Sequence, residues 1–360
     1  MNKSQFFKGL KVIELASVLA GPSVGLFFSE LGAKVIKVEN KLTEGDVTRK
    51  WKLPSENKES PFSAYYYSIN WHKEVLMMDL MDPEDLAVLI ELLKDADVVI
   101  TNFKAGGAEK LGVGYEQLKA LNPSLIYASV NAYGEDNPKP GFDVVIQAET
   151  GWVFMNGEEK GLPIKMPVAL MDVLAGHQLK EGVLLALLDR EKTGLGAKVS
   201  ISLFDAGVAS LANQATNWLN LNSIPQRMGS QHPNIAPYGD IFYTSDNKAL
   251  IVSTGTNKQW QDLCEILGNP GLVTDERFQD NSHRLAHRAE LCEALASGFK
   301  AYEAEVLMRI CEERNVPIAP IRNMQEVFEL QAAKDLVLEE TMPDGTVSKR
   351  VKTAVFKISS

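Results

Sequence analysis

The chain has 360 residues, enough for two domains with a sizeable core. Its formal net charge of −10 argues against nucleic acid and anionic membrane as general partners. No apolar run is long enough to span a bilayer, and the N-terminal residues lack the apolar segment of a signal peptide. Three widely spaced cysteines and a lone His283/His287 pair predict neither disulfides nor a metal site, so we expect a cytoplasmic protein.

Strands and helices alternate along the first two hundred residues. A helix from Gly21-Pro22 to about Leu31 follows the first strand, and Asp82 and Pro83 begin another. The segments with strand patterns are Leu10–Leu15, Ala33–Glu39, Glu74–Asp79, Ala96–Ile100, Ser124–Val130 and Lys198–Ser202. Such alternation predicts a Rossmann-like, doubly wound α/β domain in which parallel strands are joined by right-handed crossovers.

A long helical pattern begins after Asp172 and closes on Thr193-Gly194. Asp is a preferred N-cap residue, so Asp172 could simply cap this helix. A helix start also offers free N–H groups and the positive end of the dipole, so we expect an ionised carboxylate fixed in direction. Such a group could also be a nucleophile presented from a rigid element, although the residue alone favours the cap.

The character of the chain changes after a further helix, Phe204–Leu221. Residues 226–239 form a loop dense in glycine and proline, and a hairpin turning at Asp246-Asn247 and charged helices through Arg314 follow. The final residues return to a strand pattern at Arg350–Lys357. We therefore expect a large domain (1–200), a linker helix (201–225), a smaller α+β domain (226–318) and a C-terminal return to the large domain (319–360).

Two segments near the N-terminus could bind a nucleotide. The turn Ala20–Gly25 follows a strand, and Glu39 ends the next strand, as in a dinucleotide site. The turn lacks the G-x-G-x-x-G pattern and contains Pro22, which disfavours NAD. Lys and Arg interleave with Trp51 and Trp71 in residues 46–75, which suits either a phosphate-bearing nucleotide or a solvated loop anchored by tryptophan.

Two later segments could also carry chemistry. Thr101–Gly107 follows a strand, and ligands bind at the carboxyl ends of parallel strands. Residues 137–151 bring Asp143, Gln147 and Glu149 near one another, with Glu149 either a general acid or base or a surface helix residue. The sequence has no G-x-S-x-G, P-loop or H-E-x-x-H motif, so hydrolase and kinase functions lack their usual support.

In this order, the motifs resemble those of the class III (family III) CoA-transferases, the CaiB/BaiF group that includes formyl-CoA transferase and the carnitine CoA-transferases. The resemblance covers nearly the whole chain. It rests on Leu19–Pro22, Gly32–Glu39, Gly45-Asp46 with Thr48-Arg49 and Trp51, Asn70, Lys73, Asp79, Ala96–Val98, Asn102-Phe103, Asn122–Ser129, Pro140–Asp143 with Gln147, Asp172 with Ala175-Gly176, Arg190 with Lys192–Gly194 and Gly196, and Pro237–Gly239.

The resemblance implies a homodimer of interlocked rings and places the family's catalytic aspartate on Asp172. That residue would attack an acyl-CoA, giving a mixed anhydride and then an aspartyl-CoA thioester, from which CoA passes to a small carboxylic acid. Coenzyme A thioesters would be substrates, with no permanently bound cofactor. The residues implied to bind CoA are Val18, Leu19, Ala20, Asn102, Phe103, Lys110 and Lys139, and those implied to border the acceptor pocket are Trp51, Phe142 and Gln147.

Two alternatives stay open. The related α-methylacyl-CoA racemases use a histidine in Gly-His-Asp, where this chain has Gly141-Phe142-Asp143, and phenylalanine cannot move a proton. A non-catalytic CoA-binding protein is the other alternative, because Asn40 and Glu74 replace residues that are basic in many members.

Further departures from the family concern specificity and length. Leu19 stands where formyl-CoA transferase has glutamine, and Met228–Pro233 takes the place of that enzyme's glycine-rich lid. The chain is shorter than most members, so we expect either a truncated C-terminus or an absent terminal helix.

Overall fold

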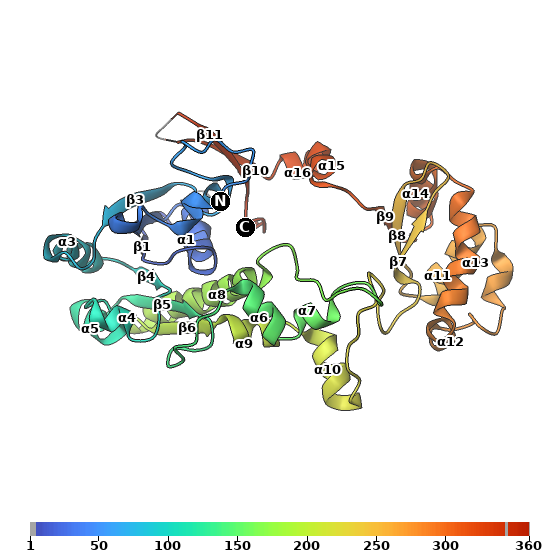
Figure 1. Ribbon diagram of the computed structural model, residues 1–360, viewed down its shortest axis with the longest axis horizontal. Coiled ribbons are helices and arrows are strands. Elements are labelled where there is room, and N and C mark those ends of the chain that lie inside the picture. The colour runs from blue at the N-terminus through green and yellow to red at the C-terminus, as the bar shows by residue number, and fades with distance from the viewer. Residues whose placement is uncertain (1–4, 343–344, 360) are drawn as a thin grey trace. The chain divides into compact units, whose positions relative to one another are not determined.

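The computed structural model describes residues 5–342 and 345–359. The chain forms two units (Figure 1). The first unit holds the described residues up to Trp152, Lys165–Ile224 and those from Ala332 onward, and the second holds Val153–Ile164 and Pro225–Gln331. No helix among the described residues is long and apolar enough to cross a lipid bilayer.

A parallel six-stranded sheet forms the centre of the first unit, with strand order β3-β2-β1-β4-β5-β6. The strands are β1 (Lys11–Glu14), β2 (Lys34–Asn40), β3 (Lys73–Met78), β4 (Val98–Thr101), β5 (Ile126–Asn131) and β6 (Lys198–Ser202). All six match strand patterns in the sequence within two residues at each end. This is the order of a doubly wound sheet, in which ligands bind where the strand order reverses, here between β1 and β4.

Helices cover both faces of this sheet, so successive residues of a strand belong to different cores. Val12 of β1 packs in the core that contains α1 and α8, whereas Ile13 packs in the core beneath α3 and α5. The helices of this unit are α1 (Ala20–Glu30), α2 (Ala64–Tyr67), α3 (Pro83–Leu93), α4 (Gly107–Lys110), α5 (Tyr115–Leu121), α6 (Asp143–Glu149), α8 (Leu170–Thr193), α9 (Leu203–Ala209) and α10 (Ala212–Leu221), with short 3₁₀ turns at Lys41–Thr43 and Val47–Lys50.

The N-terminal halves of α1 and α8 pack directly against each other. At Gly176 of α8, an added Cβ would lie 2.2 Å from the Ser23 hydroxyl oxygen and 3.1 Å from the Ala20 carbonyl oxygen. Glycine is therefore required at this crossing. As the sequence predicts, α8 closes on Gly194, which adopts a left-handed φ of 72°.

The second unit has its own sheet and core. Its antiparallel strands follow the order β7-β8-β9, and helices α11 to α14 bury a separate apolar cluster. The elements are β7 (Tyr238–Tyr243), β8 (Ala249–Ser253), β9 (Ile318–Pro320), α11 (Asn257–Ile266), a 3₁₀ turn at Pro270–Val273, α12 (Asn281–Ala286), α13 (Arg288–Lys300), α14 (Ala304–Glu313) and α15 (Met324–Glu329), while α7 (Trp152–Met155) and α16 (Gln331–Lys334) lie where the chain passes between units.

This division differs from the expected boundaries in three places. Residues 153–164 belong to the second unit, which also extends to Gln331 rather than 318. Residues 201–224 belong to the first unit. The expected single helix there is two helices, because Ala212, the first residue of the second helix, adopts a φ of 48°.

The C-terminal segment does return to the first unit, but it adds no strand to the main sheet. Strands β10 (Val337–Thr341) and β11 (Val347–Val351) form their own antiparallel pair. The Glu30 carboxylate at the end of α1 accepts hydrogen bonds from Arg350 and from the backbone N–H groups of Thr353 and Ala354. The guanidinium of Arg350 also lies 4.9 Å from the centre of the Trp71 ring.

Candidate active site

Asp172 lies in the first turn of α8, but it does not cap the helix. The helix begins at Leu170, so the expectation that Asp172 is the N-cap residue is wrong. The capping carboxylate comes from Asp143 on α6, the helix beside α8 (Figure 1). Its Oδ1 accepts a hydrogen bond of 2.7 Å from the backbone N–H of Met171. The Asp172 side chain is thereby left available for another role.

The expectation that Asp172 is held ionised is also wrong. Burial and the negative charge of Asp143 raise the pKa of Asp172 to about 7. The carboxylate has no hydrogen bond from any described residue that would favour its charged form. With a pKa of about 7, the group is near half-protonation at neutral pH. A carboxylate of raised pKa is also more basic, and so a better nucleophile, than an ordinary aspartate.

A cleft of about 530 Å³ opens beside the N-terminal halves of α1 and α8. Its lining is largely apolar and also holds the side chains of Asp143, Lys165, His177 and Lys180. Neither lysine forms an ion pair with a described carboxylate. The lining comprises Leu19, Ser23, Leu26 and Phe27, then Tyr65, Ser68 and Ile69, then Asp143, Lys165, Pro167, Val168 and Ala169, and finally Val173, Gly176, His177, Lys180 and Thr353.

Tyr65 is a cleft residue that sequence reasoning missed. Burial, together with the negative charges of Asp172, Asp143 and Asp46, raises its pKa to about 12, so the phenol stays protonated at neutral pH. The ring of Trp51 meets the Tyr65 ring edge-on at 5.2 Å, which brings this predicted pocket residue close to the cleft. Nothing in the run of three tyrosines at 65–67 distinguishes Tyr65, since only the fold puts it near Asp172.

The other two predicted pocket residues have different surroundings. Phe142 is exposed and immediately precedes Asp143 at the start of α6. Gln147 is fully buried, and its amide is used by the protein. Its oxygen accepts from the backbone N–H of Met166, while its nitrogen donates to Asp143. Gln147 thus holds both the capping carboxylate and the segment that leads into α8.

The turn after β1 is held by side chains from other elements. Asn102 binds Ser17 twice, accepting from its N–H at 3.1 Å and donating to its carbonyl oxygen at 2.9 Å. The next residue, Val18, has a φ of 71°, which is unusual for a β-branched side chain. Leu19 lines the cleft, and α1 begins at Ala20.

Phe103 lines a second, smaller cavity of about 170 Å³ at the carboxyl ends of β1, β2 and β3. The other lining residues are Leu15, Val38, Asn40, Met78, Asp79, Leu80, Met81 and Leu111. Asn40 also accepts a hydrogen bond from the backbone N–H of Leu42, so its side chain shapes the loop after β2. A largely apolar cavity in this position is typical of ligand sites in doubly wound sheets.

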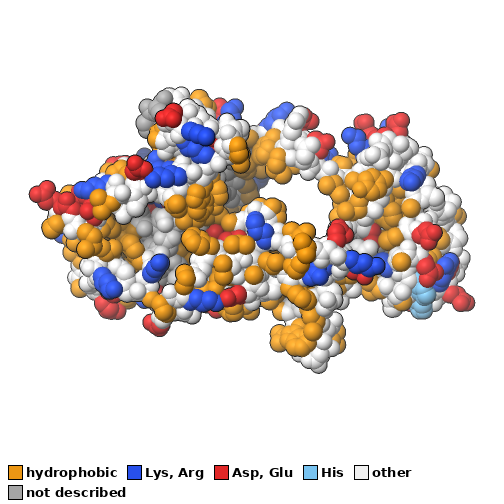
Figure 2. Space-filling view, viewed as in Figure 1, with side chains coloured by type: hydrophobic (Ala, Val, Ile, Leu, Met, Phe, Trp, Pro, Cys, Tyr) orange, Lys and Arg blue, Asp and Glu red, His pale blue; other side chains and the backbone are white. Residues whose placement is uncertain are grey.

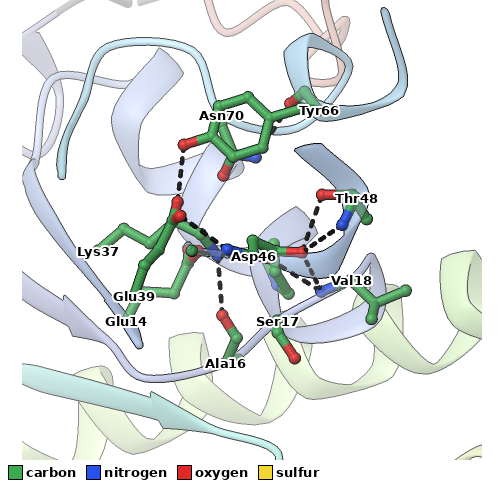
Figure 3. A network of polar contacts seen from close by, with 12 residues as sticks. Glu14, Ala16, Ser17, Val18, Lys37, Glu39, Asp46, Thr48, Tyr66 and Asn70 are labelled. Carbon is green, nitrogen blue, oxygen red and sulfur yellow. Dashed lines mark hydrogen bonds and ion pairs between the residues drawn. The ribbon is translucent and has the colours of Figure 1, made fainter. Parts of the chain in front are cut away.

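A buried chain of charges lies beneath the turn (Figure 3). Lys73 binds Glu14 at 2.8 Å, Glu14 binds Lys37 at 2.9 Å, and Lys37 binds Asp46 at 3.0 Å. All four side chains are at most 1% exposed. Asp46 then accepts hydrogen bonds from Thr48 and from the backbone N–H of Val18. The chain therefore connects the interior of the sheet to the turn.

Glu39, which the dinucleotide interpretation assigned to a ribose, is occupied by protein groups. Its carboxylate pairs with Arg49 at 2.6 Å and accepts hydrogen bonds from the Tyr66 hydroxyl and the backbone N–H of Asp46. The residue is only 3% exposed. The structure therefore supports the sequence argument against NAD at this turn.

The two lysines implied to bind CoA lie apart from this network. Lys110 is exposed at the end of α4, and Lys139 forms an ion pair of 2.5 Å with Glu149. Glu74 is exposed and pairs with Lys34, whereas its neighbour Lys73 points into the buried charge chain. In the second unit, the loop Met228–Gln231 lines a separate cavity of about 640 Å³.

Comparison with known proteins gives one consistent assignment. The sequence profile of CoA-transferase family III matches residues 7–360. The succinate–glutarate CoA-transferase of Agrobacterium fabrum is 37% identical over 99% of this chain and 90% of its own length. The acetyl-CoA:oxalate CoA-transferase of Acetobacter aceti is 33% identical over 92% of this chain and 85% of its own.

A solved structure agrees. The crystal structure of a CaiB/BaiF family protein from Brucella suis superimposes with a TM-score of 0.83 at 36% identity, covering 98% of this chain and 93% of that one. Together with the six-stranded parallel sheet, these matches decide the assignment: the chain belongs to CoA-transferase family III and is a transferase enzyme.

Proposed function

We propose that this enzyme moves CoA from an acyl-CoA to a small dicarboxylic acid through covalent intermediates on Asp172. The observation that carries the proposal is the Asp172 carboxylate itself. It stands in the first turn of a long helix whose residues Val173 and Gly176 line the 530 Å³ cleft. It has a raised pKa and no hydrogen bond from a described residue. A rigidly presented, basic carboxylate suits nucleophilic attack on a thioester.

The reaction would use four acyl exchanges. Asp172 attacks the thioester carbonyl, the C–S bond breaks, and the CoA thiolate leaves from a mixed anhydride. The thiolate attacks the Asp172 carbonyl, which releases the donor acid and leaves an aspartyl-CoA thioester. The acceptor carboxylate attacks this thioester, forming a second anhydride and freeing the thiolate, which then attacks the acceptor's acyl carbonyl and restores Asp172. No intermediate is hydrolysed, so the free energy of the thioester bond is retained in the product.

The start of α1 supplies donors for the oxyanions of these steps. The N–H groups of Leu19, Ala20 and Gly21 have no hydrogen-bond acceptor within residues 5–342 and 345–359, as is usual for a first helical turn. Leu19 lines the same cleft as Asp143 and Tyr65. Fixed N–H donors that meet a developing oxyanion stabilise it strongly, and the protonated Tyr65 phenol would add another donor.

For CoA, we propose a path along the turn after β1 and over Phe103. The backbone of Val18, Leu19 and Ala20 would contact the pantetheine arm, and the cavity at Phe103 would receive an apolar part of the nucleotide. Lys110 and Lys139 would meet the phosphates, the latter by leaving its surface ion pair with Glu149. Exposed ion pairs of this kind contribute little free energy, so exchanging one partner costs little.

The dicarboxylic class of acceptor has two supports. Relatives that match nearly the whole chain are named for succinate, glutarate and oxalate. Independently, Lys165 and Lys180 line the cleft without a carboxylate partner among the described residues. An acid with a second carboxylate could place one end near Asp172 and the other near these cations, with Trp51 and Phe142 bordering the entrance.

The test is a matrix of donors and acceptors read by mass spectrometry. Succinyl-CoA and acetyl-CoA are incubated with oxalate, succinate and glutarate, and with acetate and propionate as monocarboxylate controls. We expect new CoA thioesters of the diacids. Hydroxylamine should trap the activated aspartyl group and give a modified peptide that contains Asp172. CoA binding without exchange in any pair would instead support the non-catalytic alternative.

The racemase alternative is tested in the same samples. An α-methylacyl-CoA in deuterated water, without acceptor, would gain deuterium at the α-carbon if the enzyme were a racemase. We expect no such exchange, because position 142 carries an exposed phenylalanine in place of histidine.

The pH dependence should report the pKa of Asp172. Because only the ionised carboxylate attacks, kcat/KM for the acyl-CoA should rise with pH through about 7. Asp143→Asn keeps an oxygen for the Met171 N–H but removes the negative charge that helps to raise this pKa, so the rise should move to lower pH. An unchanged profile would show that Asp143 does not influence the nucleophile.

We further propose a homodimer, and the interlocked form implied by the family resemblance. Helix α10 has no buried residue, and Figure 2 shows hydrophobic side chains gathered over it. Trp218, Leu219 and Leu221 are 47%, 75% and 72% exposed. Apolar patches of this kind mark protein–protein contacts. Sedimentation velocity should give twice the mass of one chain, and a monomer at micromolar concentration would contradict the proposal.

A further inference from the structure

The turn Ala16–Leu19 is held by side chains from other parts of the chain. Lys37 and Asp46 are buried, and Asn102 is partly buried. Lys37 of β2 donates to the carbonyl oxygen of Ala16 at 2.8 Å. Asn102, just after β4, binds both backbone groups of Ser17. Asp46 accepts from the N–H of Val18 at 3.2 Å. In Figure 3 the Asp46 carboxylate lies between Val18 and Thr48. Consecutive backbone groups are thus held from outside the turn.

The conformation so held is costly. Val18 has a φ of 71°, in the left-handed region where a Cβ crowds the backbone and a β-branched side chain does so more. Such strain persists only where the surroundings over-determine it, and it concentrates at functional sites. The residue that follows, Leu19, lines the cleft beside Asp143 and opens α1.

We propose that Asn102 and Asp46 are positioning residues that hold Val18 left-handed, and so aim the first N–H groups of α1 at the reacting thioester. The inference rests on the proposed function, and it changes the role of Asn102. Both amide atoms of Asn102 are already used on Ser17, so its side chain serves the enzyme by shaping the turn rather than by touching CoA. Asp46 acts in the same way, and the buried charge chain through Lys37 fixes Asp46 itself.

The experiment measures the effect of Asn102→Ala alone and when it is combined with Val18→Gly or with Val18→Ala. Glycine adopts positive φ without penalty, whereas alanine keeps most of the strain. Val18→Gly and Val18→Ala both remove the valine side chain, so any contact it makes is lost equally. We expect Asn102→Ala to lower kcat/KM for acyl-CoA, and to weaken CoA binding by isothermal titration, by roughly ten-fold or more. The double variant with glycine should bind CoA roughly ten-fold more tightly than the double variant with alanine.

Each other outcome overturns the proposal. If the two double variants bind CoA equally weakly, Asn102 contacts the ligand directly. If Asn102→Ala lowers only the melting temperature, with CoA binding and kcat/KM unchanged, its role is purely structural.

A readout without ligand separates this proposal from the proposed function. Hydrogen–deuterium exchange of peptides spanning Ser17–Gly25 should speed up in Asn102→Ala, because the N–H of Ser17 loses its acceptor. This result is expected even if the wild-type enzyme transfers no CoA under any condition. Unchanged exchange would overturn the positioning role while leaving CoA transfer through Asp172 intact.

Discussion

Asp172→Asn is expected to reduce CoA transfer at least about a thousand-fold while making the folded protein more stable at neutral and higher pH. The loss of activity follows because an amide cannot attack the thioester, and removing a nucleophile costs several orders of magnitude in kcat. The gain in stability follows from the surroundings of the carboxyl group, which disfavour its charge. General damage to the fold would lower both activity and stability, so it would not give lower activity together with higher stability.

The direction of the pH effect follows from the shift in pKa. The folded-state pKa of Asp172 is about 7, above its ordinary value of 3.8, so the native protein binds this proton more tightly than the unfolded chain does. That contribution to stability is fully present below about pH 4 and is lost as pH rises through 7. Asparagine does not titrate, so the stability difference between variant and wild type should widen from about pH 4 to pH 7 and then stay constant.

A matched control lies on the same helix. Asp189 is exposed near the end of α8 and does not line the cleft, so Asp189→Asn should leave CoA transfer unchanged and should not stabilise the protein as Asp172→Asn does. Urea unfolding at about pH 4, 6 and 8 supplies the free energies. If Asp172→Asn is less stable than wild type at pH 8, the carboxylate is not held in the disfavoured charged state described above.

Lys37→Met is expected to cost about 3–5 kcal/mol of unfolding free energy, the largest loss of stability that we expect from one substitution on β2. Lys37 is completely buried between Glu14 and Asp46 and also donates to the carbonyl oxygen of Ala16. Removing the cation leaves Glu14 paired with Lys73 alone and takes from Asp46 its partner cation. An uncompensated buried charge is far more costly than a lost surface pair.

Lys34→Met is the control for this prediction. Lys34 starts the same strand, but it pairs with Glu74 at the surface, with both side chains more than half exposed. Its loss should change stability by at most about 1 kcal/mol. Salt should weaken the Lys34 contribution further and leave the Lys37 effect unchanged, because buried pairs are screened little. Equal melting temperatures for the two variants would contradict a stabilising role for the buried charge chain.

The sheet could be predicted from the sequence because its signals are local. Each strand is a short apolar run between breakers, and the cap of α3 is the adjacent Asp82, whose carboxylate accepts from the N–H of Glu84. The start of α8 could not be predicted in this way. Its cap comes from Asp143, 28 residues earlier in the chain, and no local pattern indicates that hydrogen bond.

The surroundings of the candidate site were less predictable than Asp172 itself. The raised pKa of Asp172 depends on how deeply the fold buries it and on the approach of Asp143, neither of which is visible in the sequence. In the sequence, Glu14 and Lys37 look like ordinary polar residues of strands. Their burial is tolerable only because the fold brings these opposite charges on neighbouring strands together. Tyr65 likewise enters the site only through the fold.

The return of residues 332–360 to the first unit has a consequence for biosynthesis. Glu30 and Trp71 are synthesised long before Arg350, which contacts both of them. Synthesis of Pro225–Gln331 in between takes on the order of ten seconds. During that interval the nascent first unit lacks residues 332–360. The second unit has a separate hydrophobic core, so it can fold before the first unit is completed.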